Sequence, residues 1–325
     1  MSSQFDVISI GSATIDAILK SKDFKVVKNK GFETGLAICE MYGSKTSIDD
    51  FYIGSGGGAT NSSCSLSHLG MKTSCVSVVG DDVFSEFIYD DLLKYKVGID
   101  NLIVEKNKKT AFSTILTAPD GGRTVMVYRG PCSNITKKSI ESQKLDTGWV
   151  YLTNLGTNFE NAKEVILFLK EKDIKVFWNP GLNEMENADI SFLENIDVLN
   201  INVEEASKLS NLSMENVKEI LKFFVKNTSK CAVLLTLAEK GAFFIQNKQI
   251  IHVSSFKVTV ENTVGAGDAF GSGFLYGFAN DLGIERSLEY GIKNSVSVIQ
   301  KTGAKEGFLQ DINTLPKPNI KKISN

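Results

Sequence analysis

The second half of the sequence alternates between short apolar runs and longer amphipathic segments, and this alternation constrains the fold more than any other feature. The apolar runs have strand length, and the segments between them have helical spacing. We expect strands at Trp149–Leu152, Lys175–Trp178, Asp197–Ile201 and Cys231–Thr236, with helices near Asn158–Lys170, Ala188–Glu194 and Met214–Lys226. Strands that alternate with helices form a mostly parallel sheet covered on both faces. The sequence therefore predicts an α/β fold.

The first half contains similar elements, but strand-like segments interrupt it twice. A buried strand is expected at Phe5–Ile10, and helices are expected at about 59–69 and 83–95. The interruptions cover about residues 13–53 and 108–130. In the second, Pro119–Gly122 (PDGG) separates two alternating segments, which is a hairpin signal. We expect the two excursions to pair into a small sheet outside the main core.

The end of the chain contains a second hairpin and two helices. The hairpin joins Phe243–Gln246 to Gln249–Val253, and the helices lie near Gly267–Ala279 and Ile284–Gln300. The tail from Pro316 is rich in lysine and asparagine, so we expect it to be frayed.

Composition excludes several classes of protein. Lysine and arginine total 36 and aspartate and glutamate total 38, a formal net charge of −2. This balance lacks the basic footprint of a dedicated nucleic-acid binder. No apolar run approaches the ~18 residues of a membrane span, and the N-terminus lacks the basic start of a secretory signal. The sequence thus predicts a cytoplasmic protein without nucleic-acid or membrane partners.

Cysteine and histidine content exclude further chemistries. The five cysteines form no CxxC pair and have no zinc-ligand spacing, which indicates reduced thiols rather than disulfides or a structural metal. The two histidines, His68 and His252, lie in patterns typical of ordinary structural positions. These patterns argue against Ser-His-Asp and Cys-His catalysis.

Two glycine-rich segments carry most of the chemical information. Gly54–Asn61 (GSGGGATN) joins a strand to a helix and matches a loose dinucleotide fingerprint. That fingerprint normally follows the first strand of the fold, here Phe5–Ile10, so a tight turn before a helix explains the segment equally well.

The second segment, Asn262–Gly271 (NTVGAGDAFG), opens an apolar helix. Free N–H groups at a helix start favour an anion. Asp268 would repel a phosphate unless it has a further task, such as accepting the proton of an attacking hydroxyl. For this residue alone two interpretations stay open, a general base or an acidic group that favours the helix dipole.

Together, the two segments resemble the two signatures of the ribokinase-like (PfkB) carbohydrate kinase family. Asn262–Phe270 is similar to the family pattern D-T-x-G-A-G-D, and Gly56–Asn61, followed by Leu69-Gly70 and Val79–Asp82, is similar to its N-terminal signature. Further matches are Gly11-Ser12 with Asp16, Asp120–Arg123 with Tyr128–Gly130, Asn179–Gly181, Asn202–Glu205, Thr236–Gly241, and Asn294 with Gly303-Ala304. The resemblance covers about residues 5–308.

The resemblance implies a ribokinase-like three-layer sandwich with a mostly parallel central sheet and a small β-sheet lid. It also implies an ATP-dependent kinase that moves the γ-phosphoryl group to a hydroxyl of a sugar. The two signatures should converge on one site, so residues 1–325 would form a single catalytic domain with a lid from 13–53 and 108–130. Exposed edges of such a lid could be covered by the lid of a second copy, which would make a homodimer.

The resemblance also assigns site residues. Asp268 would be the catalytic base, and the backbone N–H groups of Gly265, Ala266 and Gly267 would form the anion hole. The implied substrate-binding residues are Asp16, Gly57, Asn61 and Arg129. The implied residues around ATP and Mg²⁺ are Asn202, Glu205, Thr236, Gly241 and Asn294, with Glu205 nearest the metal.

Two positions depart from the family pattern. Asn262 stands where the family usually has aspartate, and Ala238 stands where the nucleotide segment usually has glycine. In many members the aspartate region also helps to bind a monovalent cation, so a K⁺ requirement is in doubt here.

Other functions compete with a sugar kinase. An adenosine kinase-like nucleoside kinase would use the same scaffold, with Phe112, Phe32 or Tyr42 as candidate contacts for the base. A dinucleotide-dependent oxidoreductase would leave Asn262–Asp268 without a role. A non-catalytic sugar or nucleotide sensor would not need a base inside an anion hole.

Overall fold

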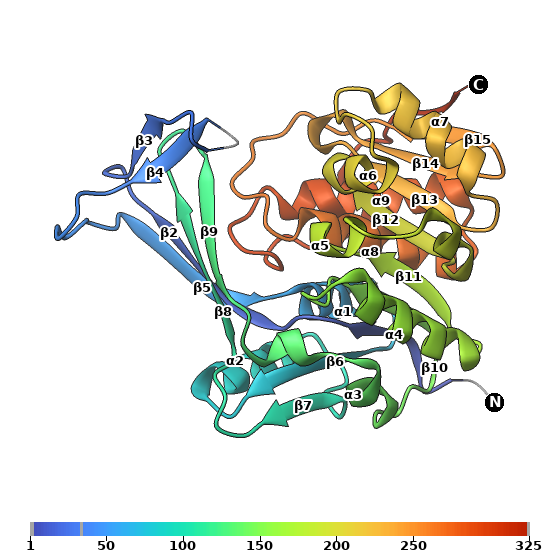
Figure 1. Cartoon of the computed structure of the whole chain (residues 1–325), viewed down its shortest axis with the longest axis horizontal. Coiled ribbons are helices and arrows are strands. Elements are labelled where there is room, and N and C mark those ends of the chain that lie inside the picture. Colours follow the sequence, from blue (N-terminus) through green and yellow to red (C-terminus); the bar gives the residue numbers. More distant parts are fainter. Residues whose placement is uncertain (1–2, 33–34, 324–325) are drawn as a thin grey trace.

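The computed structural model describes residues 3–32 and 35–323 (Figure 1). Residues 1–2, 33–34 and 324–325 of the expected domain, lid and tail lie outside this described part. The main sheet has the strand order β16-β15-β14-β13-β12-β11-β10-β1-β6-β7. Its parallel strands are β1 (Phe5–Ile10), β6 (Thr73–Gly80), β7 (Leu102–Glu105), β10 (Thr147–Thr153), β11 (Lys175–Asn179), β12 (Val198–Asn202) and β13 (Ala232–Thr236). The antiparallel edge consists of β14 (Ala242–Gln246), β15 (Gln249–Val253) and β16 (Ile320–Ile323).

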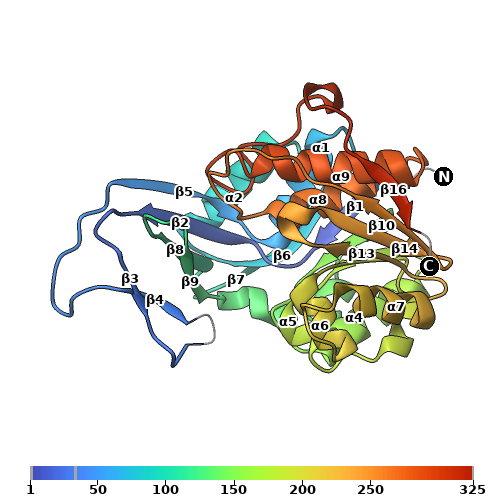
Figure 2. The same ribbon diagram turned by 90° about the horizontal axis from the view of Figure 1, so that it is seen from above.

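Helices cover both faces of this sheet (Figure 2). One face carries α1 (Gly58–His68), α2 (Val83–Lys94), α8 (Ala266–Ala279) and α9 (Ile284–Val298), and the other carries α3 (Lys137–Glu141), α4 (Phe159–Glu171), α5 (Leu182–Met185), α6 (Val203–Ser210) and α7 (Val217–Asn227). Successive strand residues point to opposite faces. In β13, Val233 and Leu235 therefore join one core cluster while Ala232 and Leu234 join the other. The predicted three-layer α/β fold is confirmed.

A separate lid sheet projects from the main body (Figure 1). Its strand order is β5-β2-β8-β9, with bounds β2 (Thr14–Lys20), β5 (Asp50–Gly56), β8 (Ala111–Thr117) and β9 (Arg123–Tyr128). The two expected excursions thus pair with each other through the parallel strands β2 and β8. A small hairpin of β3 (Lys25–Lys28) and β4 (Leu36–Cys39) extends from the far end of the lid.

Three local expectations differ from the structure. The segment expected as a helix near Ala188–Glu194 forms a 3₁₀ helix at Ile190–Asn195, which the Asp189 side chain caps by accepting from the Ser191 N–H. Helix α6 begins at the expected strand-to-helix junction after Asn202, but its span was not among the expected helices. The expectation that the tail would fray is wrong for Ile320–Ile323, because these residues pair with β15.

The carboxyl ends of the parallel strands carry polar residues, and the sheet aligns them. Thr153 at the end of β10 pairs with Asn179 at the end of β11, and Asn202 at the end of β12 pairs with Thr236 at the end of β13. Open α/β sheets bind ligands at this edge. Among the described residues, no helix combines the length and apolar character needed to cross a membrane.

Candidate active site

Helix α8 begins with a glycine turn at the carboxyl edge of the sheet. Gly265, its N-cap residue, has a φ of 76°, a left-handed conformation that favours glycine. A helix start leaves its first N–H groups without intrahelical partners. The Ala266 N–H makes only a 3.4 Å contact with the Thr263 carbonyl. Gly265, Ala266 and Gly267 line a cavity of about 210 Å³, so the turn presents its backbone to an anion-sized space.

Asp268 lies in the first turn of α8 and lines the same cavity. The side-chain amide of Asn61 donates to its Oδ2 at 2.9 Å, and the amide of Asn179 donates to its Oδ1 at 3.1 Å. Asn200 in turn donates to the Oδ1 of Asn179 at 3.1 Å. Amides from α1 and β11 therefore hold the carboxylate from both sides.

Burial raises the pKa of Asp268 to about 6. The hydrogen bonds from Asn61 and Asn179 and the positive charge of Lys305 oppose this rise, while the negative charge of Asp16 adds to it. A carboxylate with such a pKa is mostly ionised at neutral pH and accepts a proton more readily than an exposed aspartate.

The first glycine segment brings the predicted substrate residues together. Gly57 has a φ of 93°, and a Cβ there would lie 2.5 Å from the Ser12 carbonyl oxygen, so only glycine fits this turn. Asp16 on β2 packs so closely against the turn that a Cβ at Gly56 would lie 1.9 Å from its Oδ2. Thr14 donates to the Oδ1 of Asp16 at 2.9 Å, and burial raises the pKa of this carboxyl group.

A groove of about 690 Å³ adjoins the anion-sized cavity and shares Asn202, Thr236 and Gly267 with it. Thr236, Ala238 and Gly241, which belong to the segment predicted to border the nucleotide, line the groove. Asn294 does not line it. This residue is fully buried and binds Ser65 Oγ, the Ala269 carbonyl and the Leu309 N–H, all internal groups.

Asn202 and Glu205 form a reciprocal capping box at the start of α6. The Asn202 side chain accepts from the N–H groups of Glu204 and Glu205 at 2.8 and 2.9 Å, and Glu205 Oε2 accepts from the Asn202 N–H at 2.9 Å. Burial raises the pKa of Glu205 to about 7. The pair lines the anion-sized cavity but spends most of its hydrogen-bonding capacity on the helix.

The donor set suits a sparsely held Mg²⁺ rather than a metal cage. Among the described residues, no group of three or more His, Cys, Asp or Glu side chains could hold a metal ion. Glu205 Oε1 is the carboxylate oxygen of this pair that the capping box leaves available. Mg²⁺ keeps several waters and relies on one or two carboxylates plus phosphates, so the residues present fit it.

Two lid arginines face the site from different sides. Arg129 lines a recess of about 60 Å³ together with Ser12, Thr14 and Asn154. Arg123, at the start of β9, lines the large groove and donates to the Thr263 hydroxyl beside the α8 turn. The second lid segment thus lies beside both the recess at Ser12 and Thr14 and the turn that precedes α8.

Sequence reasoning missed Arg123, Asn179, Asn200 and Lys305 as site residues. Asn179 was visible as a polar residue at the end of a predicted strand, and Arg123 as part of the lid match. Asn200 and Lys305 carried no local signal, because their importance depends on contacts with residues distant in sequence.

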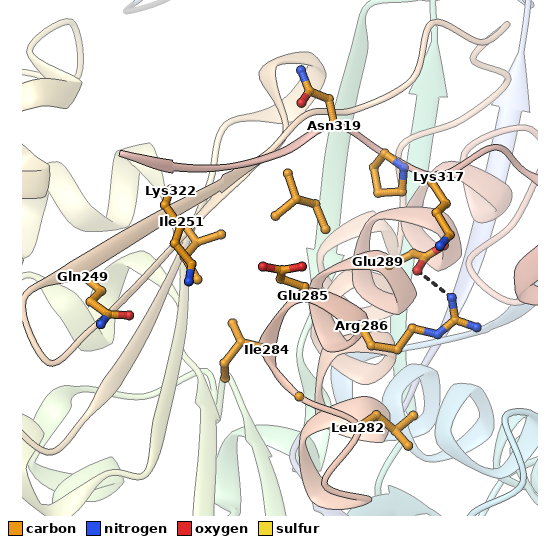
Figure 3. Close-up of a pocket in the computed structure, with 13 residues that line it drawn as sticks. Gln249, Ile251, Leu282, Ile284, Glu285, Arg286, Glu289, Lys317, Asn319 and Lys322 are labelled. Carbon is orange, nitrogen blue, oxygen red and sulfur yellow. Dashed lines mark hydrogen bonds and ion pairs between the residues drawn. The ribbon is translucent and has the colours of Figure 1, made fainter. Parts of the chain in front are cut away.

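A cavity of about 840 Å³ lies away from these residues, between the start of α9 and β16 (Figure 3). Its charged side chains include Glu285, Lys317 and Lys322, and an ion pair joins Arg286 to Glu289. None of the predicted site residues lines it. Size alone therefore does not identify the active site.

The chain is similar to known sugar and nucleoside kinases. A ribokinase of Lactococcus lactis is 25% identical over 264 residues, which are 80% of this chain and 84% of that protein. The solved Arabidopsis thaliana ribokinase, described as complexed with ribose and ATP, has a TM-score of 0.76 at 20% identity and covers 97% of both chains. The adenosine kinase of Sinorhizobium meliloti has a TM-score of 0.74 at 20% identity, covering 93% of this chain and 96% of that one.

The structural likenesses show the ribokinase-like fold, and the family model carries the assignment further. The model described as pfkB family carbohydrate kinase matches residues 4–311, nearly the whole chain. The chain belongs to the pfkB family of carbohydrate kinases, and the protein is a phosphotransferase of that family.

Proposed function

We propose that this protein transfers the γ-phosphoryl group of ATP to a hydroxyl group of a sugar. The observation that carries the proposal is Asp268, a carboxylate held by two amides beside a glycine turn and an anion-sized cavity. A base next to an anion hole suits phosphoryl transfer, which depends on positioning and charge stabilisation.

In this proposal Asp268 is the general base. The acceptor hydroxyl gives its proton to the Asp268 carboxylate as its oxygen attacks the phosphorus, and the bond to the β-phosphate oxygen breaks. Asn61 and Asn179 orient the carboxylate, because each donates to a different oxygen. The backbone of Gly265–Gly267 stabilises the charge on the phosphoryl oxygens, where one donor can be worth ~3–4 kcal/mol.

The sugar would lie between the first glycine turn and the lid. Asp16 offers a buried carboxylate to sugar hydroxyls, and Gly57 allows close approach of the backbone. Asn61 has a buried Oδ1 without a hydrogen-bond partner among the described residues, and this oxygen can accept from a hydroxyl. On the lid side, Arg129 would border the sugar from the recess that it lines.

ATP would occupy the groove bordered by Thr236 and Gly241, with its phosphates toward Gly267. When bound, Mg²⁺ neutralises charge on the phosphates. Glu205 and Asn202 would hold its waters rather than enclose the ion. Asn294 is buried in the core, and we assign it the role of fixing α9 to α8 and α1.

A monovalent cation fits Asn262 poorly. Its Oδ1 already accepts from the Val264 N–H at 2.8 Å, and its Nδ2 is buried without an acceptor among the described residues. An N–H donor repels a cation, whereas an aspartate would attract it. We therefore propose that turnover does not require K⁺.

A nucleoside kinase remains the second candidate. The likeness to a structure described as adenosine kinase supports it. Phe112 lies beside the substrate strand, paired with Ile15 across β2 and β8, and could contact a base. Phe32 and Tyr42 are exposed at the far part of the lid.

We also propose a homodimer formed through the lids. Six large apolar side chains on the lid strands are exposed, namely Phe51, Ile53, Val125, Met126, Val127 and Tyr128. Burying these side chains against a second lid would remove them from water.

We also propose a cytoplasmic location, with which the unpaired cysteines of the described residues are consistent.

The test is an ADP-release screen over ribose, fructose, 2-keto-3-deoxygluconate, fructose phosphates and nucleosides. A sugar acceptor is expected, and a response to nucleosides alone would select the second candidate. Asp268→Asn should lower kcat at least ~100-fold, because general-base catalysis supplies this much or more. Glu285→Gln removes the matching first-turn carboxylate of α9 and should leave kcat unchanged. Near-normal turnover of Asp268→Asn would refute the assigned base.

A further inference from the structure

Lys305 is a buried cation in the loop that follows α9. Its residue is 3% exposed. Its ammonium donates to the Ser55 carbonyl at 2.8 Å and to Thr60 Oγ1 at 3.1 Å, it pairs with Asp91 Oδ2 at 3.2 Å, and it also contacts Ser55 Oγ. An ammonium has three donors, so these partners satisfy it fully.

The three partners belong to different elements that meet at the base of the lid. Ser55 lies on β5, Thr60 on α1 and Asp91 on α2. Ser55 Oγ also donates to Asp91 Oδ2, and Thr60 Oγ1 donates to the Gly56 carbonyl at 2.7 Å. One ammonium thus connects the strand that enters the first glycine turn to the helix that leaves it.

Ser55 and Thr60, which Lys305 holds, each stand one residue before a residue that contacts a carboxylate of the proposed site. Gly56, which follows Ser55, is the residue against which the Asp16 carboxylate packs. Asn61, which follows Thr60, donates to Asp268. A shift of Ser55 or Thr60 would therefore displace the substrate carboxylate or the amide that orients the base.

The charge of Lys305 acts on the same groups. It lowers the pKa of both Asp16 and Asp268, against the effect of burial. The other titratable groups linked electrostatically to this cluster include Asp91, Lys94 and Tyr95 from α2 and its end, Tyr52 from β5, Cys64 from α1, Cys75 from β6 and Glu306 from the same loop. Of these, the negative charge of Asp91 partly offsets the ammonium.

We propose that Lys305 is a positioning residue for phosphoryl transfer, which pins the base of the lid to α1 and α2 and thereby holds Asp16 and Asp268 in place. This inference rests on the proposed function of Asp268. A positioning role differs from a purely structural one, and the chain contains a second buried lysine that serves as a structural comparison. Lys293 is equally buried and pairs with Glu289 at 2.7 Å, but its other contact is the Ile312 carbonyl, away from the glycine turn.

The experiment measures the pH dependence of kcat and kcat/KM, with thermal unfolding, for Lys305→Met, Asp91→Asn and Lys293→Met. Lys305→Met should move the acid limb of the profile up by about one pH unit, which lowers kcat/KM at least about fivefold at pH 6. Asp91→Asn should move that limb down, because it leaves the ammonium charge uncompensated. Lys293→Met should lower the Tm without moving the limb.

Lys305→Arg serves as the conservative variant. It should keep the acid limb of the pH profile at its wild-type position, even if the larger group lowers kcat. It also covers the case in which Lys305→Met does not fold. An acid limb that is the same in wild type, Lys305→Arg, Lys305→Met and Asp91→Asn would overturn the proposal. Failure of the proposed function is separate, since it would appear as the absence of phosphorylated product with the wild-type enzyme or as normal turnover of Asp268→Asn.

Discussion

Replacing Asn179 with alanine should produce a loss of activity that depends strongly on pH. The amide of Asn179 donates to Asp268 Oδ1 at 3.1 Å, and it stabilises the ionised carboxylate more than the protonated acid. Its removal should therefore make Asp268 easier to protonate. Asp268, the proposed base, then stays protonated over a wider range of acidic pH.

The magnitude follows from the hydrogen bond and from the pKa of the base. A hydrogen bond to a charged group contributes ~1.5–3 kcal/mol, and water entering the site would recover part of it. A net loss of ~1.4 kcal/mol moves the acid limb up by about one pH unit. With a pKa of about 6, roughly half of the wild-type carboxylates are ionised at pH 6, against about one in eleven in the variant. The predicted loss in kcat is about fivefold at pH 6 and nearly absent at pH 8.

The assay is steady-state ADP release between pH 5 and pH 8.5, with saturating ATP and the acceptor found in the screen. Asn158→Ala is the matched control, because Asn158 caps α4 by accepting from the Asn161 N–H and lies away from the site. It should affect stability without changing the shape of the profile. An Asn179→Ala defect of equal size at every pH would refute the reasoning, since it would mean that Asn179 acts on geometry alone.

Three further predictions address the lid, the packing of α8 and the linkage of Asp268 to stability. Arg123→Ala removes the lid contact with Thr263 and should lower kcat more than it raises the KM for the acceptor, and an unchanged kcat would remove Arg123 from the site. Gly271→Ala should lower the Tm by several degrees, because its Cβ would lie 2.2 Å from the buried Tyr151 hydroxyl, whereas Gly267→Ala meets no atom within 4 Å and should unfold like wild type. Asp268→Asn should raise the Tm at pH 8 but not at pH 4. Burial raises the pKa of Asp268 from 3.8 to about 6, so its ionisation costs stability above that range, up to ~3 kcal/mol, and the cost vanishes on acidification. A gain of equal size at both pH values would contradict this linkage.

Local patterns predicted most of the elements, because strands and helices reflect spacing over a few residues. Strand β1 was expected with the bounds that the structure has, and β9 followed the hairpin signal at Pro119–Gly122. The start of helix α6 after Asn202 was expected, but its span was not, since only eight residues carry its pattern. The tail strand β16 was missed because its pairing with β15 depends on a partner far along the chain.

Some residues of the candidate site could likewise be predicted from local sequence, and others could not. The turn before α8 and the carboxylate of Asp268 at that turn could be predicted, since both belong to one short glycine-rich segment. The placement of Asn202 at a strand end followed from the expected parallel sheet. The burial of Asn294 could not be predicted, because a polar residue on a helix gives no sign of which neighbours will enclose it.

The sequence by itself determined the layered α/β architecture, the two glycine turns and the presence of a carboxylate at the second turn, since these depend on local spacing and backbone conformation. Only the tertiary structure decided which side chains act on that carboxylate. Asn61 reaches Asp268 across 207 residues, and Lys305 reaches Ser55 across 250. Such contacts depend on the order of strands in the sheet and the packing of helices over it, which no short stretch of sequence encodes.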